Sequence, residues 1–149
     1  MKEVFLKKGW AGKTLSRVDS IARINPILEQ HNALNYTYDA ATARLQNADV
    51  RLSLEQHQKI ARADAGKLSE SILSMGGVPR SGVGMERTDF DPGESSEEIR
   101  NTLLRLEEQF LKALADEHGA NHQMRNRAIL QNVEKNTRAR ADYLKSAQF

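Results

Sequence analysis

Apolar residues that recur every three or four positions are the feature that most restricts the fold of this 149-residue chain. Such spacing places side chains on one face of a helix. Four stretches show it, with apolar positions at Ile27, Leu34, Tyr38, Ala41 and Leu45; Val50, Leu54, Ala61, Leu68 and Ile72; Ile99, Leu103, Leu106, Phe110 and Leu114; and Met124, Leu130, Val133, Ala141 and Leu144. No stretch of useful length alternates as a strand would. The sequence therefore predicts an all-α fold with four helices.

Helix-breaking residues set the expected ends of these helices. Asn25-Pro26 is typical of a helix start, because asparagine caps helices and proline suits their first turn. Gly76-Gly77 followed by Pro79 is typical of a helix end. The stripes and breaks together predict helices at about 26–47, 50–75, 96–118 and 121–147.

The stretch 78–94 is rich in glycine and proline and shows no apolar period. We interpret it as a long crossover between two helix hairpins. That connectivity is typical of ferritin-like bundles, whereas simple up-and-down bundles have only short loops. The expected organisation is thus an N-terminal arm over residues 1–24 and one bundle over residues 25–149.

Composition excludes several classes of protein. The chain has no cysteine, so disulfides, thiolate metal sites and cysteine nucleophiles are excluded, and a reducing, cytoplasmic location is expected. No stretch approaches the roughly 18 apolar residues of a membrane span. A net charge of +2 is weak for a dedicated DNA-binding protein, which disfavours nucleic acid as the partner.

The end of the second helical stretch carries a family resemblance. Its residues are Asp64-Ala65-Gly66-Lys67-Leu68, then Ile72, then Met75-Gly76-Gly77-Val78-Pro79. This pattern resembles ferritin-like proteins such as rubrerythrins and the DNA-protecting ferritins. The resemblance implies a ferritin-like four-helix bundle. In members with a di-iron site it also implies one glutamate on each of helices one and three, plus Glu-x-x-His on helices two and four.

Most of those metal ligands are replaced in this chain. Asp64 stands where the resemblance places the histidine of helix two, and Thr137 and Arg140 stand at the ligand positions of helix four. Only Glu107, on helix three, is retained, and the matching depth of helix one falls near Tyr36. A guanidinium at a ligand position repels a metal cation. We therefore expect a degenerate metal site and no cofactor.

Asp64 lies within an otherwise apolar stripe, where an unpaired carboxylate would cost several kcal/mol. We predict that Asp64, Arg140 and Glu107 form a buried ionic cluster in place of the metals. The alternative is a slightly rotated helix on which Asp64 reaches water at the side of the bundle.

The histidines offer weaker metal candidates. His31 and His57 lie on neighbouring stripes at similar distances from the turn at Asn47, so they could form a two-histidine site with Glu29 and Glu55 nearby. Glu107 is a further candidate ligand for such a divergent site. His118 and His122 are four residues apart, which suits one helix face, but no third ligand accompanies them.

The N-terminal arm combines apolar and basic side chains. We predict that it docks on a partner protein or on another subunit, through Phe5, Lys7, Lys8, Trp10 and Lys13. The alternatives are an arm that folds back onto its own bundle and a frayed tail.

No catalytic constellation emerges from the sequence. The leading hypothesis is a non-catalytic ferritin-like bundle that acts as a structural or accessory protein-binding subunit or as a homo-oligomer. The first alternative is a metal-dependent oxidase or iron-binding protein with a divergent site. The second is a nucleic-acid-associated ferritin-like protein.

Overall fold

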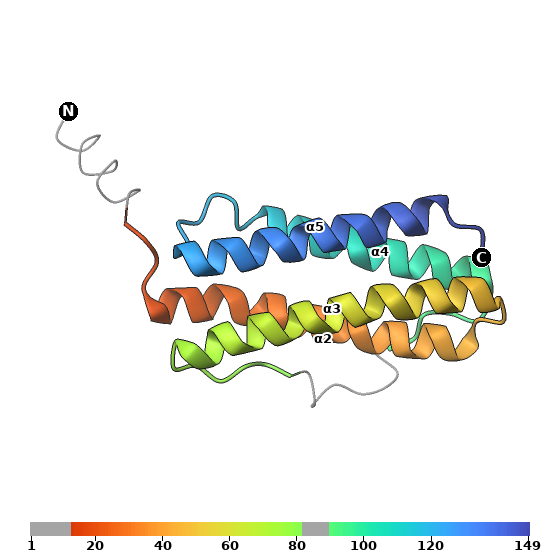
Figure 1. The fold of residues 1–149 in the computed structure, drawn as a ribbon, viewed down its shortest axis with the longest axis horizontal. Helices are drawn as coiled ribbons and strands as arrows, with labels where there is room; N and C mark the ends of the chain where they lie inside the picture. Colours follow the sequence, from red (N-terminus) through yellow and green to blue (C-terminus); the bar gives the residue numbers. More distant parts are fainter. Residues whose placement is uncertain (1–12, 82–89) are drawn as a thin grey trace.

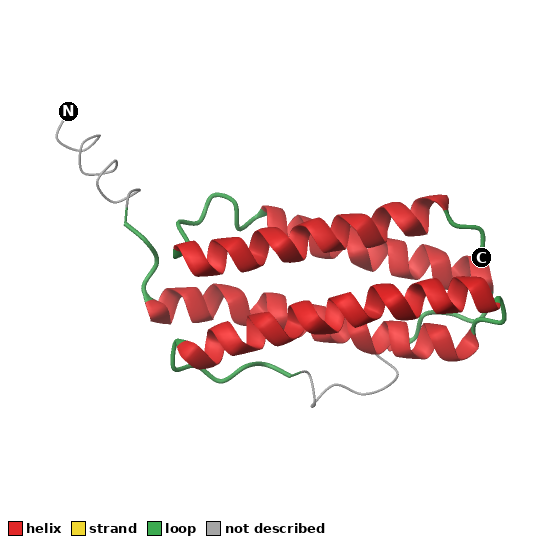
Figure 2. Ribbon diagram, in the orientation of Figure 1, coloured by secondary structure: helices red, strands yellow, loops and turns green. Residues whose placement is uncertain are grey.

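A computed structural model describes residues 13–81 and 90–149 of the chain. Within these ranges the chain forms four helices, α2 (Arg17–Arg44), α3 (Ala48–Ser74), α4 (Ser96–Ala115) and α5 (Met124–Ser146). Figure 1 shows them lying side by side in an elongated bundle, and Figure 2 shows that the described part of the chain contains no strand. The predicted all-α four-helix bundle is confirmed.

Each helix packs against two others. α2 packs against α3 and α4, and α5 packs against the same two helices, so α2 and α5 lie on one diagonal. An ion pair between Arg23 and Glu117 joins the start of α2 to the end of α4, at 2.8 Å between Nε and Oε1. Neighbouring helices are therefore antiparallel, and α3 ends at the opposite end of the bundle from the start of α4, as Figure 1 shows.

The start of α2 differs from the prediction. The helix begins at Arg17, and the Ser16 hydroxyl caps it by accepting a hydrogen bond from the Asp19 amide at 3.1 Å. Pro26 therefore lies inside the helix. The interpretation of Asn25-Pro26 as a helix start was wrong, and residues 17–24 belong to the bundle instead of the arm.

Asn25 holds the crossover instead of capping a helix. Its side chain is buried; Nδ2 donates to the Val78 carbonyl at 2.9 Å and Oδ1 accepts from the Arg80 amide at 2.8 Å. Two further α2 side chains, Asn32 and Tyr36, donate to the carbonyls of Arg80 and Ser81 at 3.0 and 3.3 Å. Polar groups along α2 thus fix the backbone of the crossover as it leaves α3.

At the other end of α2, Arg44 fixes the crossover before α4. Its Nη1 donates to the Asp91 carboxylate at 2.5 Å and to the Gly93 carbonyl at 2.8 Å. The ring of Phe90 lies 5.1 Å from that of Tyr36. Both described parts of the crossover are therefore bound to α2.

The end of α3 follows the sequence signal. Gly76 has a φ of 89°, and the Gly77 amide donates to the Ile72 carbonyl at 2.9 Å. This arrangement is a Schellman motif, in which a glycine takes the left-handed conformation that other residues adopt only with strain. The predicted glycine cap at the end of the second helix is confirmed.

The connection from α4 to α5 is longer than predicted. α4 ends at Ala115 because the next amides, of Glu117 and His118, bond three residues back at 3.1 and 3.0 Å, which tightens the chain into turns. α5 then begins at Met124, three residues after the predicted start.

The core consists mainly of leucine, isoleucine and valine with two large aromatic side chains, Tyr38 and Phe110, all buried between the helices. In the described ranges, no helix has both the length and the apolarity that a membrane crossing requires.

Candidate functional site

A buried ion pair lies at the centre of the bundle. Arg140 of α5 and Glu107 of α4 are 1% and 0% exposed, and Arg140 Nε donates to Glu107 Oε2 at 2.5 Å. Arg140 Nη2 also donates to the Thr137 hydroxyl at 3.0 Å, and that hydroxyl donates to the Val133 carbonyl at 2.6 Å. The guanidinium is therefore held on two sides.

The helical repeat explains why an arginine faces the core. Asn126, Val133 and Arg140 are spaced seven residues apart, which is two helical turns, and all three are buried. Arg140 thus shares its face of α5 with apolar core residues. A charge at such a position needs a buried partner, and Glu107 on the adjacent helix supplies it.

Burial and the ion pair shift the acidity of the groups at this centre. Burial raises the pKa of Glu107 to about 7, and the positive charge of Arg140 partly opposes this shift. Burial also raises the pKa of Tyr38 well above its ordinary value, and the negative charge of Glu107 adds to that effect. The low polarity of the surroundings therefore has the largest effect on both pKa values. It disfavours the charged form of any group that lacks a close partner of opposite charge.

His31 lies beside the pair in the same core. Its ring stacks on Phe110 with centroids 4.7 Å apart and 11° between the planes. Among the described residues, neither ring nitrogen has a partner at full hydrogen-bond distance and angle. Burial, reinforced by the charge of Arg140 and weakly opposed by the Ala61 backbone, lowers the pKa of His31 to about 3. The imidazole is therefore neutral at physiological pH.

Asp64 lies apart from the direct ion pair. It is 1% exposed, and its two carboxylate oxygens accept hydrogen bonds from Asn136 at 2.9 Å and from Asn132 at 3.4 Å. Burial raises its pKa, against the hydrogen bond from Asn136 and the charge of Arg140. The structure thus brings Glu107 and Arg140 into contact, and amides instead of the guanidinium bind Asp64.

His57, the other histidine predicted for a divergent metal site, contacts a different residue from His31. His57 is half-buried, and its ring lies 5.1 Å from that of Tyr143 on α5. Burial lowers its pKa, and the charge of Arg140 acts in the same direction. Across residues 13–81 and 90–149, no three histidine or carboxylate side chains are grouped as a metal ion would require.

One of the predicted positions points away from the centre. Tyr36, placed near the ligand depth of helix one, faces the crossover and is 38% exposed, whereas Tyr38 is the tyrosine in the core. Of the five arm residues, Phe5, Lys7, Lys8 and Trp10 lie outside the described residues, and Lys13 is exposed.

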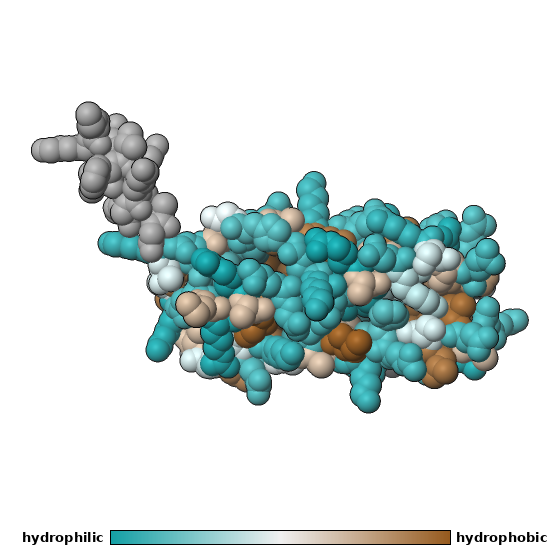
Figure 3. Space-filling model, turned by 45° about the horizontal axis from the view of Figure 1, so that its top comes forward, coloured by the Kyte–Doolittle hydropathy of each residue, from teal (hydrophilic) through white to brown (hydrophobic). Residues whose placement is uncertain are grey.

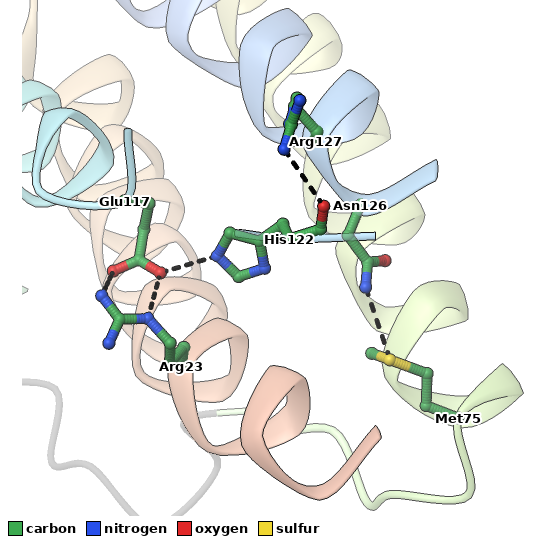
Figure 4. A network of polar contacts seen from close by, with 6 residues as sticks. All are labelled: Arg23, Met75, Glu117, His122, Asn126 and Arg127. Atoms are coloured by element: carbon green, nitrogen blue, oxygen red, sulfur yellow. Dashed lines mark hydrogen bonds and ion pairs between the residues drawn. The ribbon is translucent and has the colours of Figure 1, made fainter. Parts of the chain in front are cut away.

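A second polar network lies where α2 begins and α4 ends (Figure 4). Glu117 accepts two hydrogen bonds from Arg23, at 2.8 and 3.1 Å, and its Oε1 is 2.8 Å from His122 Nε2. Burial raises the pKa of Glu117, but the hydrogen bonds from Arg23 and His122 outweigh it and hold that pKa below its ordinary value. The network ties α2 to the loop that precedes α5.

A cavity of about 340 Å³ adjoins this network. Glu117 and His122 line one part of it, and His118 and Glu134 line another, with 2.9 Å between His118 Nε2 and Glu134 Oε2. Leu130 contributes an apolar surface. His118 thus faces a carboxylate of α5, and His122 faces one within the same α4–α5 connection, instead of the two imidazoles facing each other.

Sequence reasoning missed most of these polar partners. It did not predict Asn132 and Asn136 as partners of Asp64, nor Arg23 and Glu117 as partners of each other. The helical periodicity of apolar residues predicts which side chains face inward, but it does not identify their partners on the neighbouring helix. One signal was present: Asn126 occupies the same two-turn repeat as Arg140, and its side chain is hydrogen-bonded to that of Ser71 on α3.

Comparison of the chain with protein-family models, with curated proteins and with solved structures finds no significant match in any of the three.

Proposed function

We propose that this chain is a ferritin-like bundle that has lost its metal site and serves as a non-catalytic structural or accessory protein-binding subunit. The observation that supports this proposal is the buried Glu107–Arg140 pair. In the di-iron proteins that the sequence resembles, the metals are held in the bundle core by side chains on facing helices. In this chain the Arg140 guanidinium lies in the core instead and pairs with Glu107, the one retained carboxylate.

The surface of α5 supports a binding role through charge. Its exposed side chains include the basic residues Arg125, Arg127, Lys135, Arg138 and Lys145. The face of the molecule in Figure 3 is mostly hydrophilic, and its apolar residues form small separate areas. Such a surface favours an acidic protein partner whose association is guided by charge and weakened by salt.

Two measurements on the untagged full-length chain test the proposal. Elemental analysis of protein purified without chelators is expected to give far less than one transition-metal ion per chain. Native mass determination is expected to show a complex with itself or with a second protein. Stoichiometric iron or manganese would instead favour the metal-dependent alternative.

Charge reversal then tests the surface. Lys135→Glu with Arg138→Glu is expected to weaken the complex and to reduce its dependence on salt. Arg105→Glu, an exposed arginine on α4, is the matched control and should leave the complex unchanged. Equal effects of both changes would contradict a specific role for α5.

A further inference from the structure

Three exposed apolar side chains surround the end of the α2–α3 pair. They are Val18 in the first turn of α2, Leu73 in the last turn of α3 and Val78 just beyond α3, and they are 75%, 59% and 81% exposed. We call these three residues the end patch. Single exposed apolar residues are ordinary, so the argument depends on whether the three lie together.

Local contacts bring two members of the end patch, Val18 and Val78, together, and Leu73 begins the turn that leads to Val78, because its carbonyl accepts from the Gly76 amide at 3.0 Å. Val18, Ile21 and Asn25 are three and seven residues apart and therefore share one face of α2. On that face Ile21 lies against Gly77, where an added Cβ would meet it at 3.0 Å, and Asn25 binds the Val78 carbonyl. Val18 thus lies one turn from the segment that carries Val78.

The chain itself enters the bundle beside the end patch. Residues 13–17 precede Val18 directly, and the backbone of Leu15 is fixed there by its amide, which donates to the Asn121 carbonyl at 2.8 Å. Gln123 also donates to the Leu15 carbonyl at 3.2 Å. The twelve residues before this anchor contain Val4, Phe5, Leu6 and Trp10.

We propose that residues 1–12 bind over the end patch of their own chain. Twelve residues span about 18 Å as a helix and up to about 40 Å when extended, whereas neighbouring helix axes are only about 10 Å apart. The tether also gives the segment an effective concentration of about millimolar at the patch. Its own chain is therefore the favoured occupant over any free partner present at lower concentration.

Charge does not decide between occupants. The segment carries Lys2, Lys7 and Lys8 against one acidic residue, Glu3. Around the end patch the exposed acidic residues Asp19 and Glu70 are accompanied by the exposed basic residues Arg17 and Arg80. This inference goes beyond the proposed function, because it concerns the isolated chain and needs no partner.

Trp10 makes the inference directly measurable, because it is the only tryptophan in the chain. In the full-length protein its emission is expected to be blue-shifted, and acrylamide should quench it less than in the urea-unfolded chain. Both properties should be independent of protein concentration. Trp10 quenched equally in the native and unfolded chains would overturn the proposal.

Variants locate the binding surface. Val18→Lys and Val78→Lys are each expected to shift the Trp10 emission to the red and to raise its quenching to the level of the unfolded chain. Leu52→Lys is the matched control, since Leu52 is 56% exposed in the first turns of α3, at the opposite end of the bundle. Far-ultraviolet circular dichroism checks that all three variants fold.

Two further outcomes would overturn the proposal. Protection of Trp10 that appears only at concentrations where the mass doubles would identify a second copy as the occupant. Protection that persists unchanged in both patch variants would place the segment on another surface.

Discussion

Glu107 and Arg140 show how a single buried charge constrains its partner. Each is almost fully removed from water, so neither can lose the other without leaving an unpaired charge in the core. Breaking such a pair usually costs more than the pair contributes relative to apolar residues of similar size. The pair is therefore a strong constraint on sequence even where its net contribution to stability is small.

Replacement of one partner tests this asymmetry. Glu107→Leu is expected to lower the free energy of unfolding by about 3–5 kcal/mol, because Arg140 remains charged and buried without its carboxylate. Glu107→Leu with Arg140→Met should recover most of that loss. Urea denaturation measures both variants.

An exposed ion pair provides the control. Arg62→Ala removes the cation that pairs with Asp39, and both side chains are about half exposed, so the cost should stay below about 1 kcal/mol. A Glu107 variant as mild as this control, or a double variant as unstable as the single one, would contradict the argument.

His31 gives the bundle a dependence on pH with a definite sign. Its pKa is about 3 in the folded chain and near 6.5 when unfolded, so between these values the unfolded chain binds the extra proton. Stability is therefore full above about pH 6.5 and falls as the pH decreases towards 3, by roughly 1.4 kcal/mol per pH unit for one proton.

The comparison with His31→Phe isolates this effect. The pKa of Glu107 is raised instead, so Glu107 acts in the opposite direction, but it does so in both proteins. The difference between their urea midpoints should thus grow in favour of the variant as the pH falls from 6.5 to 4. A constant difference across that range would show that His31 is protonated in the folded state.

At the scale of the helix, Pro26 shows that packing and capping can keep a segment helical through an interior proline. A proline inside a helix lacks an amide donor and costs about 3 kcal/mol relative to alanine. α2 accommodates it through a strong start at Ser16 and through packing on two neighbouring helices. The segment therefore stays helical despite a residue that sequence rules assign to a helix start.

Pro26→Ala distinguishes a helix that begins at Arg17 from one that begins at Pro26. Pro26 is exposed and interior to α2, so the variant should raise the free energy of unfolding by about 1–3 kcal/mol. A helix that began at residue 26 would gain little from the change. Thermal unfolding followed by circular dichroism measures the difference, with Ser16→Ala as a companion expected to lose about 1 kcal/mol.

Most of the fold was predictable because helix periodicity and glycine caps are local signals. The ends of α3 and the start of α4 lie within two residues of their predicted positions. The start of α2 was not predictable in this way, because Asn25 reads as a cap in sequence and binds Val78 and Arg80 in the structure. Both partners lie more than fifty residues away along the chain.

The candidate site was predictable only in part for the same reason. Periodicity placed Asp64, Glu107 and Arg140 inside, which the exposures of 1%, 0% and 1% match. It did not determine which carboxylate meets the guanidinium, because that depends on the rotation of α4 against α5. Asp64 accepts hydrogen bonds from the side-chain amides of Asn132 and Asn136, so its carboxylate is satisfied without a cation.

At the scale of the whole molecule, the two hairpins contribute differently to the centre. Both members of the buried pair belong to the α4–α5 hairpin, whereas the α2–α3 hairpin supplies His31, Tyr38 and Asp64 around it. Docking of the hairpins is therefore what removes the pair from water. The bundle cannot keep its central charges dry unless all four helices are assembled.

The crossover has a practical consequence. It is bound to α2 on both of its described sides, by Asn25 near α3 and by Arg44 near α4, so its backbone attachments do not depend on an unbroken peptide chain. A protein split within residues 82–89 would yield two complementary fragments, each one a complete hairpin with its own part of the crossover. Mixed together, these fragments should reassemble into the native bundle, which would make this small domain a reporter of proximity between any two proteins fused to its halves.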